Sequence, residues 1–304
     1  YAITFGLVCL TLQVFLPYRS VVRWLKWLTL ALLAYVGVAF SLQLDWWLVL
    51  QRIVMPQLSW SKEVLLTVVA VFGTTISPYL FFWQAAQEME DATPRGGAVD
   101  GGHRTPAEVR GHLRRIKWDT NIGMAFSNLI AFFIILSTAA TLHAAGLTTI
   151  QTSAEAAEAL RPIAGDRAFL LFALGIIGTG MLAVPVLAGS AAYAVAEAAG
   201  WRGSLDLRLQ KGEGRGFYGV MAAATLGGVL LCFMPVDPVR QLFWAAVLNG
   251  VIAVPIMAVM MLLATDRAVM GPHVIGRRLR WAGWVATLAM ALTVLALGVS
   301  MFSA

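Results

Sequence analysis

The sequence has few charged residues and only two cysteines. Asp, Glu, Lys and Arg make up 12% of the 304 positions, whereas hydrophobic residues make up 59%. Soluble domains rarely have this balance, so the composition predicts an all-α polytopic membrane protein in contact with a lipid bilayer. Cys9 and Cys232 both lie in long apolar stretches, which gives no support to a disulfide framework or a thiolate metal site.

Motifs of enzymes and of nucleic-acid-binding proteins are also missing. The sequence has no Ser/His/Asp set, no zinc-ligand spacing and no Gly-rich phosphate loop, so we expect neither an enzyme nor a resident cofactor. The net charge of +6 does not indicate a nucleic-acid partner, because basic residues of membrane proteins usually lie in cytoplasmic loops. An intramembrane enzyme or a scaffold is the alternative from a different class, and a scaffold would show no metal dependence.

Eight apolar stretches have the length of a transmembrane helix, since about 20 helical residues cross the roughly 30 Å hydrocarbon layer. We therefore expect a single transmembrane transport domain over residues 1–304. The predicted spans are Ala2 to Pro17, Trp24 to Leu42, Lys62 to Glu88, Trp118 to His143, Ala168 to Ala199, Phe217 to Met234, Val239 to Thr265, and Trp281 to Phe302.

Basic residues are distributed unequally between the loops. Seventeen of the 22 Lys and Arg residues follow odd-numbered spans, so these loops are predicted to be cytoplasmic. Residues 93–117 then form a cytoplasmic loop, and residues 148–165 form an external loop with a short helix that begins at Thr152 or Ser153. Tyr1 would start on the outer face, from which we expect an odd number of upstream spans to be missing.

The third predicted span contains a helix break. Gly73 frees the backbone, and Pro78 removes a hydrogen-bond donor and clashes with the preceding turn, so a continuous helix would break or kink between them. Ser77 and Pro78 are a good N-cap and N1 pair for a second half-helix that ends near Glu88. The break falls near the membrane midplane, where free carbonyls of unwound backbone can coordinate a cation.

Side-chain oxygen atoms accompany this backbone break. The predicted metal site consists of Gly73, Thr74, Thr75, Ser77 and Tyr79. A simple proline kink, with its carbonyls bonded to threonine hydroxyls and neighbouring helices, explains the same pattern without a ligand. An amino-acid or other organic-solute carrier is a further alternative, because the half-helix N-terminus at Ser77 could bind a carboxylate.

Small residues favour close helix packing in two other spans. Gly219, Ala223 and Gly227 recur every four residues in the sixth span. Four glycines of the fifth span are predicted to serve the same purpose: Gly175, Gly178, Gly180 and Gly189.

Three segments of the sequence are distinctive: GTTISPYLFFWQAAQEMED from Gly73 to Asp91, DTNIGMAFSN from Asp119, and GSAAYAVAE from Gly189. The first resembles the sixth helix of the Nramp family of divalent metal transporters, in particular its Nramp-related branch associated with magnesium, and the other two support this resemblance. The resemblance covers the whole chain. It implies a LeuT-type fold of two inverted five-helix repeats, in which the eight spans are the fourth to eleventh of eleven helices and three N-terminal helices are missing.

The resemblance implies a secondary transporter that moves a divalent cation by alternating access across the cell inner (plasma) membrane, with the metal ion as substrate. Ordinary family members carry a methionine and histidines in the sixth helix, whereas this chain has Ile76, Ser77, Tyr79 and Trp83 and neither Met nor His before Met89. Oxygen ligands suit Mg²⁺ or Mn²⁺ better than softer metals. Trp83 cannot relay a proton, so proton coupling of the family type is not expected.

Further polar residues are assigned to the ion path by the resemblance. Asn249 lies in the tenth family helix and is assigned to the metal site, with interhelical hydrogen bonding as the alternative. An acidic cluster of Glu88, Glu90 and Asp91 could attract a departing cation, and a solvated acidic helix end is the alternative. The predicted ion pathway comprises Trp83, Gln84, Glu88 and Asn128. For Asn128, which shares one face of the fourth span with Asn121, a structural role in helix packing is the alternative.

Overall fold

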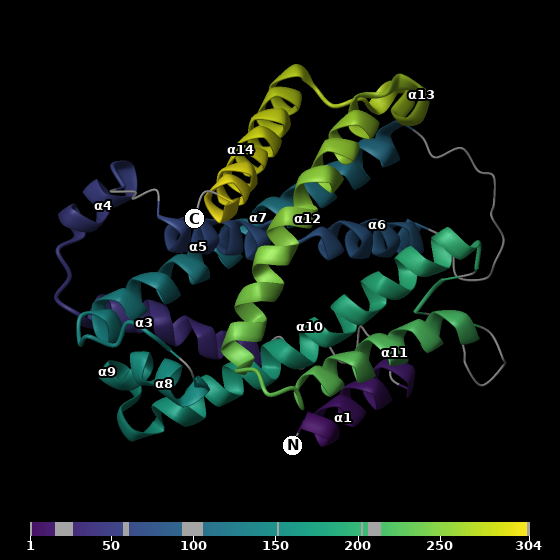
Figure 1. Ribbon diagram of the computed structural model, residues 1–304. Helices are drawn as coiled ribbons and strands as arrows, with labels where there is room; N and C mark the ends of the chain where they lie inside the picture. Colours follow the sequence, from purple (N-terminus) through teal and green to yellow (C-terminus); the bar gives the residue numbers. More distant parts are fainter. Residues whose placement is uncertain are drawn as a thin grey trace. The chain divides into compact units, whose positions relative to one another are not determined.

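The computed structural model describes residues 2–15, 27–56, 61–92, 106–150, 152–201, 203–205 and 214–302 (Figure 1). Within these ranges all regular secondary structure is helical, which confirms the all-α prediction. The chain divides into two compact units: unit 1 comprises Tyr1–Asp45 and Phe82–Pro235, and unit 2 comprises Trp46–Phe81 and Val236–Ala304.

Unit 1 is built around a long helix, α10 (Ala168–Ala199), which packs against α11 (Arg215–Leu231), α1 (Ala2–Phe15) and the 3₁₀ helix η1 (Thr29–Leu33). A second pair in this unit is α3 (Ala34–Ser41) with α7 (Pro106–Thr138). The π-helical turn η2 (Ala139–His143) follows α7 and precedes a series of short helices: α8 (Ser153–Ala157), η3 (Glu158–Leu160), α9 (Arg161–Ala164) and η4 (Gly165–Arg167).

Glycines bring helices of unit 1 close together. A Cβ atom at Gly178 would lie 2.3 Å from the Leu28 side chain, and Gly6 of α1 approaches Val229 of α11 in the same way. The packing role predicted for the glycines of α10 is therefore confirmed. The stripe predicted in α11 is wrong for the described residues, since no atom lies within 4 Å of a Cβ built at Gly219 or Gly227.

Unit 2 centres on α5 (Lys62–Thr75), α12 (Pro238–Thr265) and α14 (Arg277–Phe302), each of which packs against the other two (Figure 1). The buried side chains between them include Leu65, Val69 and Leu297. The remaining helices of the unit are α4 (Trp46–Val54), α13 (Arg267–Met270) and η6 (Gly271–His273). Helix α6 (Pro78–Ala92) begins in unit 2 and ends in unit 1.

Five helical stretches of the described residues are long and apolar enough to cross a membrane, or six if Thr29–Ser41 and Trp46–Val54 form one broken span. The five stretches correspond to five of the eight predicted spans, and Thr29–Ser41 lies within the second predicted span. The first and sixth predicted windows hold shorter apolar helices, Ala2–Gln13 and Arg215–Leu231. The second of these has 17 residues and reaches only about 25 Å.

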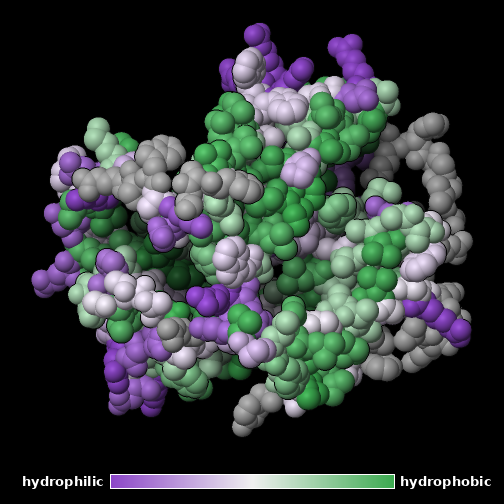
Figure 2. Space-filling model, viewed as in Figure 1, coloured by the Kyte–Doolittle hydropathy of each residue, from purple (hydrophilic) through white to green (hydrophobic). Residues whose placement is uncertain are grey.

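Hydrophobic side chains cover much of the visible surface (Figure 2). On α14, Leu288, Leu292, Leu295 and Val299 are all more than half exposed. Their spacing places them on one face of the helix. An extended apolar face of this kind in water would cause aggregation, whereas a bilayer solvates it.

Candidate metal site

The predicted break between α5 and α6 is present. Helix α5 begins at the N-cap residue Ser61, whose hydroxyl accepts a hydrogen bond from the Val64 N–H at 3.4 Å. It ends at Thr75, and Ile76 leaves the helical conformation with φ −107° and ψ 75°. Pro78 then starts α6. Proline disfavours a helical residue immediately before it, which explains why the chain extends here.

The Ser77 hydroxyl points back towards α5. Its single proton is shared between the carbonyl oxygens of Gly73 and Thr74, both 3.1 Å from Oγ, and Ser77 is only 3% exposed. Ser77 and Pro78 are the N-cap and N1 residues of α6, as predicted, but the Ser77 hydroxyl does not cap this helix. Instead, the backbone carbonyl of Ser77 accepts the Leu80 N–H, while the hydroxyl satisfies carbonyls left open at the end of α5.

The threonine hydroxyls of the break are also engaged locally. Thr74 Oγ1 and Thr75 Oγ1 both donate to the Val71 carbonyl, at 2.8 and 2.9 Å. A hydroxyl that donates its proton keeps two lone pairs, and a carbonyl that accepts one hydrogen bond keeps one. The break thus presents several neutral oxygen atoms that can still coordinate a cation. The hydrogen bonds from the threonine hydroxyls to a carbonyl of the preceding turn are also those expected of an ordinary proline kink.

Helix α12 crosses α5 at the break. A Cβ atom at Gly73 would lie 2.0 Å from the Ala246 carbonyl oxygen and 2.5 Å from the Gly250 nitrogen. A Cβ atom at Gly250 would lie 2.6 Å from the Val69 carbonyl oxygen. The two backbones therefore touch at this point, and glycine on each helix is required by the close approach.

The crossing brings Asn249 to the same level as the break. Asn249 is half-buried and lies between Ala246 and Gly250, the two α12 residues that approach Gly73. Tyr79 is half-buried in the first turn of α6. Neither the Asn249 amide nor the Tyr79 hydroxyl has a hydrogen-bond partner among the described residues. Both can therefore donate an oxygen to a ligand without breaking an existing bond.

Among the described residues no three His, Cys, Asp or Glu side chains gather in a metal-binding group. The oxygen donors at the break are hydroxyls, carbonyls and an amide. Such donors suit hard cations.

The predicted ion-pathway residues of α6 contact other helices of unit 1. Trp83 is half-buried and packs edge-on against Tyr193 of α10, with ring centroids 6.1 Å apart. Gln84 donates to the Thr120 hydroxyl of α7 at 3.1 Å. Asn128 is exposed on α7. These assignments remain predictions, and the structure shows Trp83 and Gln84 as residues that hold α6 in place.

Replacing Gly189 by alanine is expected to displace the Trp83 indole. The new Cβ would lie 2.5 Å from Trp83 Cζ3, and a rigid ring must move as a whole. We expect a loss of about 1–3 kcal/mol in stability, visible as a lower melting temperature in detergent. Gly227→Ala is the matched control, because its Cβ meets no atom within 4 Å. Equal melting temperatures for the two variants would contradict the close contact.

A polar network at the end of α6 involves Glu90, which the sequence pattern assigned only to an acidic cluster. Tyr193 Oη donates to Glu90 Oε1 at 2.6 Å, and the Leu205 N–H donates to the same oxygen at 3.0 Å. Gln87 Nε2 donates to Tyr193 Oη at 3.3 Å, and Tyr218 Oη donates to the Leu205 carbonyl. The network links α6, α10, α11 and the segment after α10.

Glu88, one of the predicted pathway residues, pairs with basic residues and not with the Tyr193 hydroxyl that binds Glu90. Its carboxylate lies 3.0 Å from Arg115 Nη2 and 3.3 Å from His112 Nε2, both on α7. Glu88 and Glu90 are therefore held by protein groups, which differs from a freely solvated acidic end. The side chain of Asp91 lies outside the described residues.

A helix break lined with oxygen atoms, inside an apolar helical protein, defines a class: polytopic membrane proteins of solute transport. Over residues 1–300 the sequence matches the family model described as natural resistance-associated macrophage protein-like, Nramp. The chain belongs to the Nramp family of divalent metal cation transporters, which has the LeuT-type fold. The resemblance read from the three sequence segments is confirmed at the level of the family.

Proposed function

We propose that the protein is a secondary transporter that carries Mg²⁺ or Mn²⁺ across the plasma membrane by alternating access, and that it leaves its substrate chemically unchanged. The observation that supports this proposal most directly is the oxygen-lined break between α5 and α6, where α12 crosses. In the proposed site the ion is held by backbone and side-chain oxygens of Gly73, Thr74, Thr75, Ser77, Tyr79 and Asn249.

The donor types favour a hard ion. Thioether and imidazole groups favour softer transition metals, whereas neutral oxygens and retained waters suit Mg²⁺ and Mn²⁺. The segment from Gly73 to Glu88 contains neither a methionine nor a histidine. A carboxylate from another helix would balance the charge of the ion, and we propose that the neutral oxygens act together with such a group.

The Glu90 network offers a means of closing the path at one end. By the distribution of basic residues, the end of α6 near Glu90 is cytoplasmic. We propose that the bond between Glu90 and Tyr193 closes the cytoplasmic exit, and that its opening accompanies release of the ion. Alternating access requires such a contact to form and break during each cycle.

Removing the Ser77 hydroxyl is expected to weaken ion binding. The full-length protein in proteoliposomes should take up Mg²⁺ or Mn²⁺, and Ser77→Ala should raise the KM for that ion about tenfold, the effect of losing one oxygen contact worth about 1.4 kcal/mol. Thr67→Val is the matched control, because the Thr67 hydroxyl also bonds to a carbonyl four residues earlier, at 2.8 Å, but away from the break.

The same assay separates the alternatives. Unchanged KM values in Ser77→Ala and Tyr79→Phe would show that the ion does not bind at the break. If the wild-type protein transports neither metal, the proposal is wrong. The next hypothesis to test is then uptake of an organic carboxylate that binds at the N-terminus of α6.

A further inference from the structure

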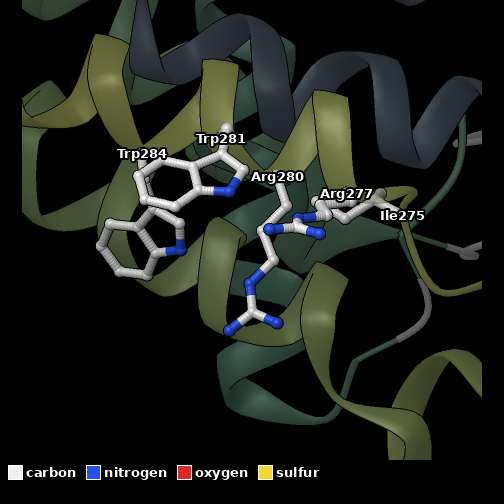
Figure 3. A pocket seen from close by; sticks show the side chains of 5 residues that line it. All are labelled: Ile275, Arg277, Arg280, Trp281 and Trp284. Atoms are coloured by element: carbon white, nitrogen blue, oxygen red, sulfur yellow. The ribbon is translucent and has the colours of Figure 1, made fainter.

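A surface pocket lies at the beginning of α14, within unit 2 (Figure 3). Its volume is about 620 Å³, and it is lined by Ile275, Arg277, Arg280, Trp281 and Trp284. Four of these residues follow the spacing i, i+3, i+4 and i+7, which places them on one face of the helix. The face therefore combines two guanidinium groups with two indole rings.

No described residue neutralises the two arginines of the pocket. Both are exposed, and neither has an ion-pair partner among the described residues. The first turn of α14 contains no acidic residue. The carboxylate nearest in sequence, Asp266, accepts the Ala268 N–H as a helix cap. The charge of the pocket is thus complementary to an anion.

The position of the pocket along α14 indicates which class of anion it binds. The stretch Arg277–Met301 is a candidate membrane span, and three exposed leucines, Leu288, Leu292 and Leu295, follow Trp284 along it. Arg277 and Trp284 are about 10 Å apart along the helix axis, a separation that spans the boundary between headgroups and hydrocarbon. Tryptophan is enriched at this level of the bilayer, and arginine at the cytoplasmic end of spans.

We propose that this pocket binds the headgroup of an anionic phospholipid in the cytoplasmic leaflet. The guanidinium groups of Arg277 and Arg280 donate to the lipid phosphate, a geometry that arginine makes in paired hydrogen bonds. The Trp281 and Trp284 rings lie against the glycerol and the first methylene groups. Trp281, at 65% exposure, has its apolar ring available for this contact. None of the pocket residues belongs to the predicted metal site or ion pathway, so the proposal does not depend on the ion that is carried.

Native mass spectrometry of the full-length protein tests the proposal, with phosphatidylglycerol and phosphatidylcholine added in equal amounts. We expect phosphatidylglycerol to be retained in preference to phosphatidylcholine. The double variant Arg277→Gln/Arg280→Gln should lower the apparent affinity for phosphatidylglycerol about tenfold. The matched control is Arg267→Gln/Arg278→Gln, which removes the same charge from the same region without touching the pocket lining, and it should change the affinity less than about twofold.

Equal losses in the two double variants would overturn the proposal, because they would show a general effect of surface charge. Equal retention of the two lipids in the wild-type protein would overturn it too. Displacement of phosphatidylglycerol by inorganic phosphate would instead identify a site for free phosphate. If the glutamine variant does not fold, Arg277→Lys/Arg280→Lys replaces it, and this variant should show a smaller but measurable loss because lysine cannot donate two parallel hydrogen bonds.

Discussion

Replacing Gly73 by alanine will force α5 and α12 apart and will lower the melting temperature of the protein. The atoms that the new Cβ would meet, Ala246 O at 2.0 Å and Gly250 N at 2.5 Å, belong to the backbone. No side-chain rotation can relieve this contact, so one helix must move. The cost of such overpacking is about 1–3 kcal/mol or more, which exceeds the roughly 1 kcal/mol that alanine gains over glycine in a helix.

Thermal denaturation in detergent measures this effect, at roughly 2–4 °C for each kcal/mol in a chain of this size. Gly250→Ala should act in the same direction, because its Cβ would lie 2.6 Å from the Val69 carbonyl oxygen. Gly298→Ala on α14 is the control, since no atom lies within 4 Å of its Cβ, and it should melt at or slightly above the wild-type temperature. A Gly73→Ala variant that melts like Gly298→Ala would rule out the crossing.

The second large effect is expected for Glu90→Gln. The substitution removes the negative charge that accepts hydrogen bonds from Tyr193 and from the Leu205 N–H. Hydrogen bonds to a charged group contribute about 1.5–3 kcal/mol each, so the end of α6 should detach from α10 far more often. We expect faster amide hydrogen exchange in the last two turns of α6 and a metal uptake rate lowered about tenfold or more.

Glu88→Gln is the matched control for this prediction. Glu88 lies two residues away, but its partner Arg115 has a side chain 51% exposed, and exposed ion pairs contribute at most about 1 kcal/mol. Tyr193→Phe should reproduce the effect of Glu90→Gln, and the double variant should add little to either, as expected for residues that share one interaction. Equal behaviour of Glu88→Gln and Glu90→Gln would show that the network does not hold α6.

Local features of the fold were predictable because their causes are local. The pair of Gly73 and Pro78 is sufficient to end one helix and begin another, and Ser61 and Thr152 cap helices as their sequence context indicates. The direction of the Ser77 hydroxyl was not predictable, because it depends on whether the open carbonyls of α5 or the open N–H groups of α6 lie nearer. Sequence spacing does not decide between them.

The start of α7 and the contact between Glu90 and Tyr193 could not be predicted from hydropathy. Helix α7 begins at Pro106, whereas the predicted span began at Trp118, because the charged residues between them are helical but are omitted from an apolar window. Glu90 and Tyr193 are 103 residues apart, so no local pattern joins them. Tyr193 lies within one of the segments that resemble the family, and this resemblance is the sequence signal that could have drawn attention to it.

The continuity of α6 has a consequence for how the two ends of the transport path communicate. The helix runs without interruption from Pro78 to Ala92, and Glu90 lies about 18 Å from Pro78 along its axis. A helix of this length behaves as a stiff rod, so in the proposed mechanism a displacement at the break reaches the Glu90 carboxylate without passing through any side-chain contact. The proposed steps of ion binding and ion release are then joined by the covalent backbone of one helix.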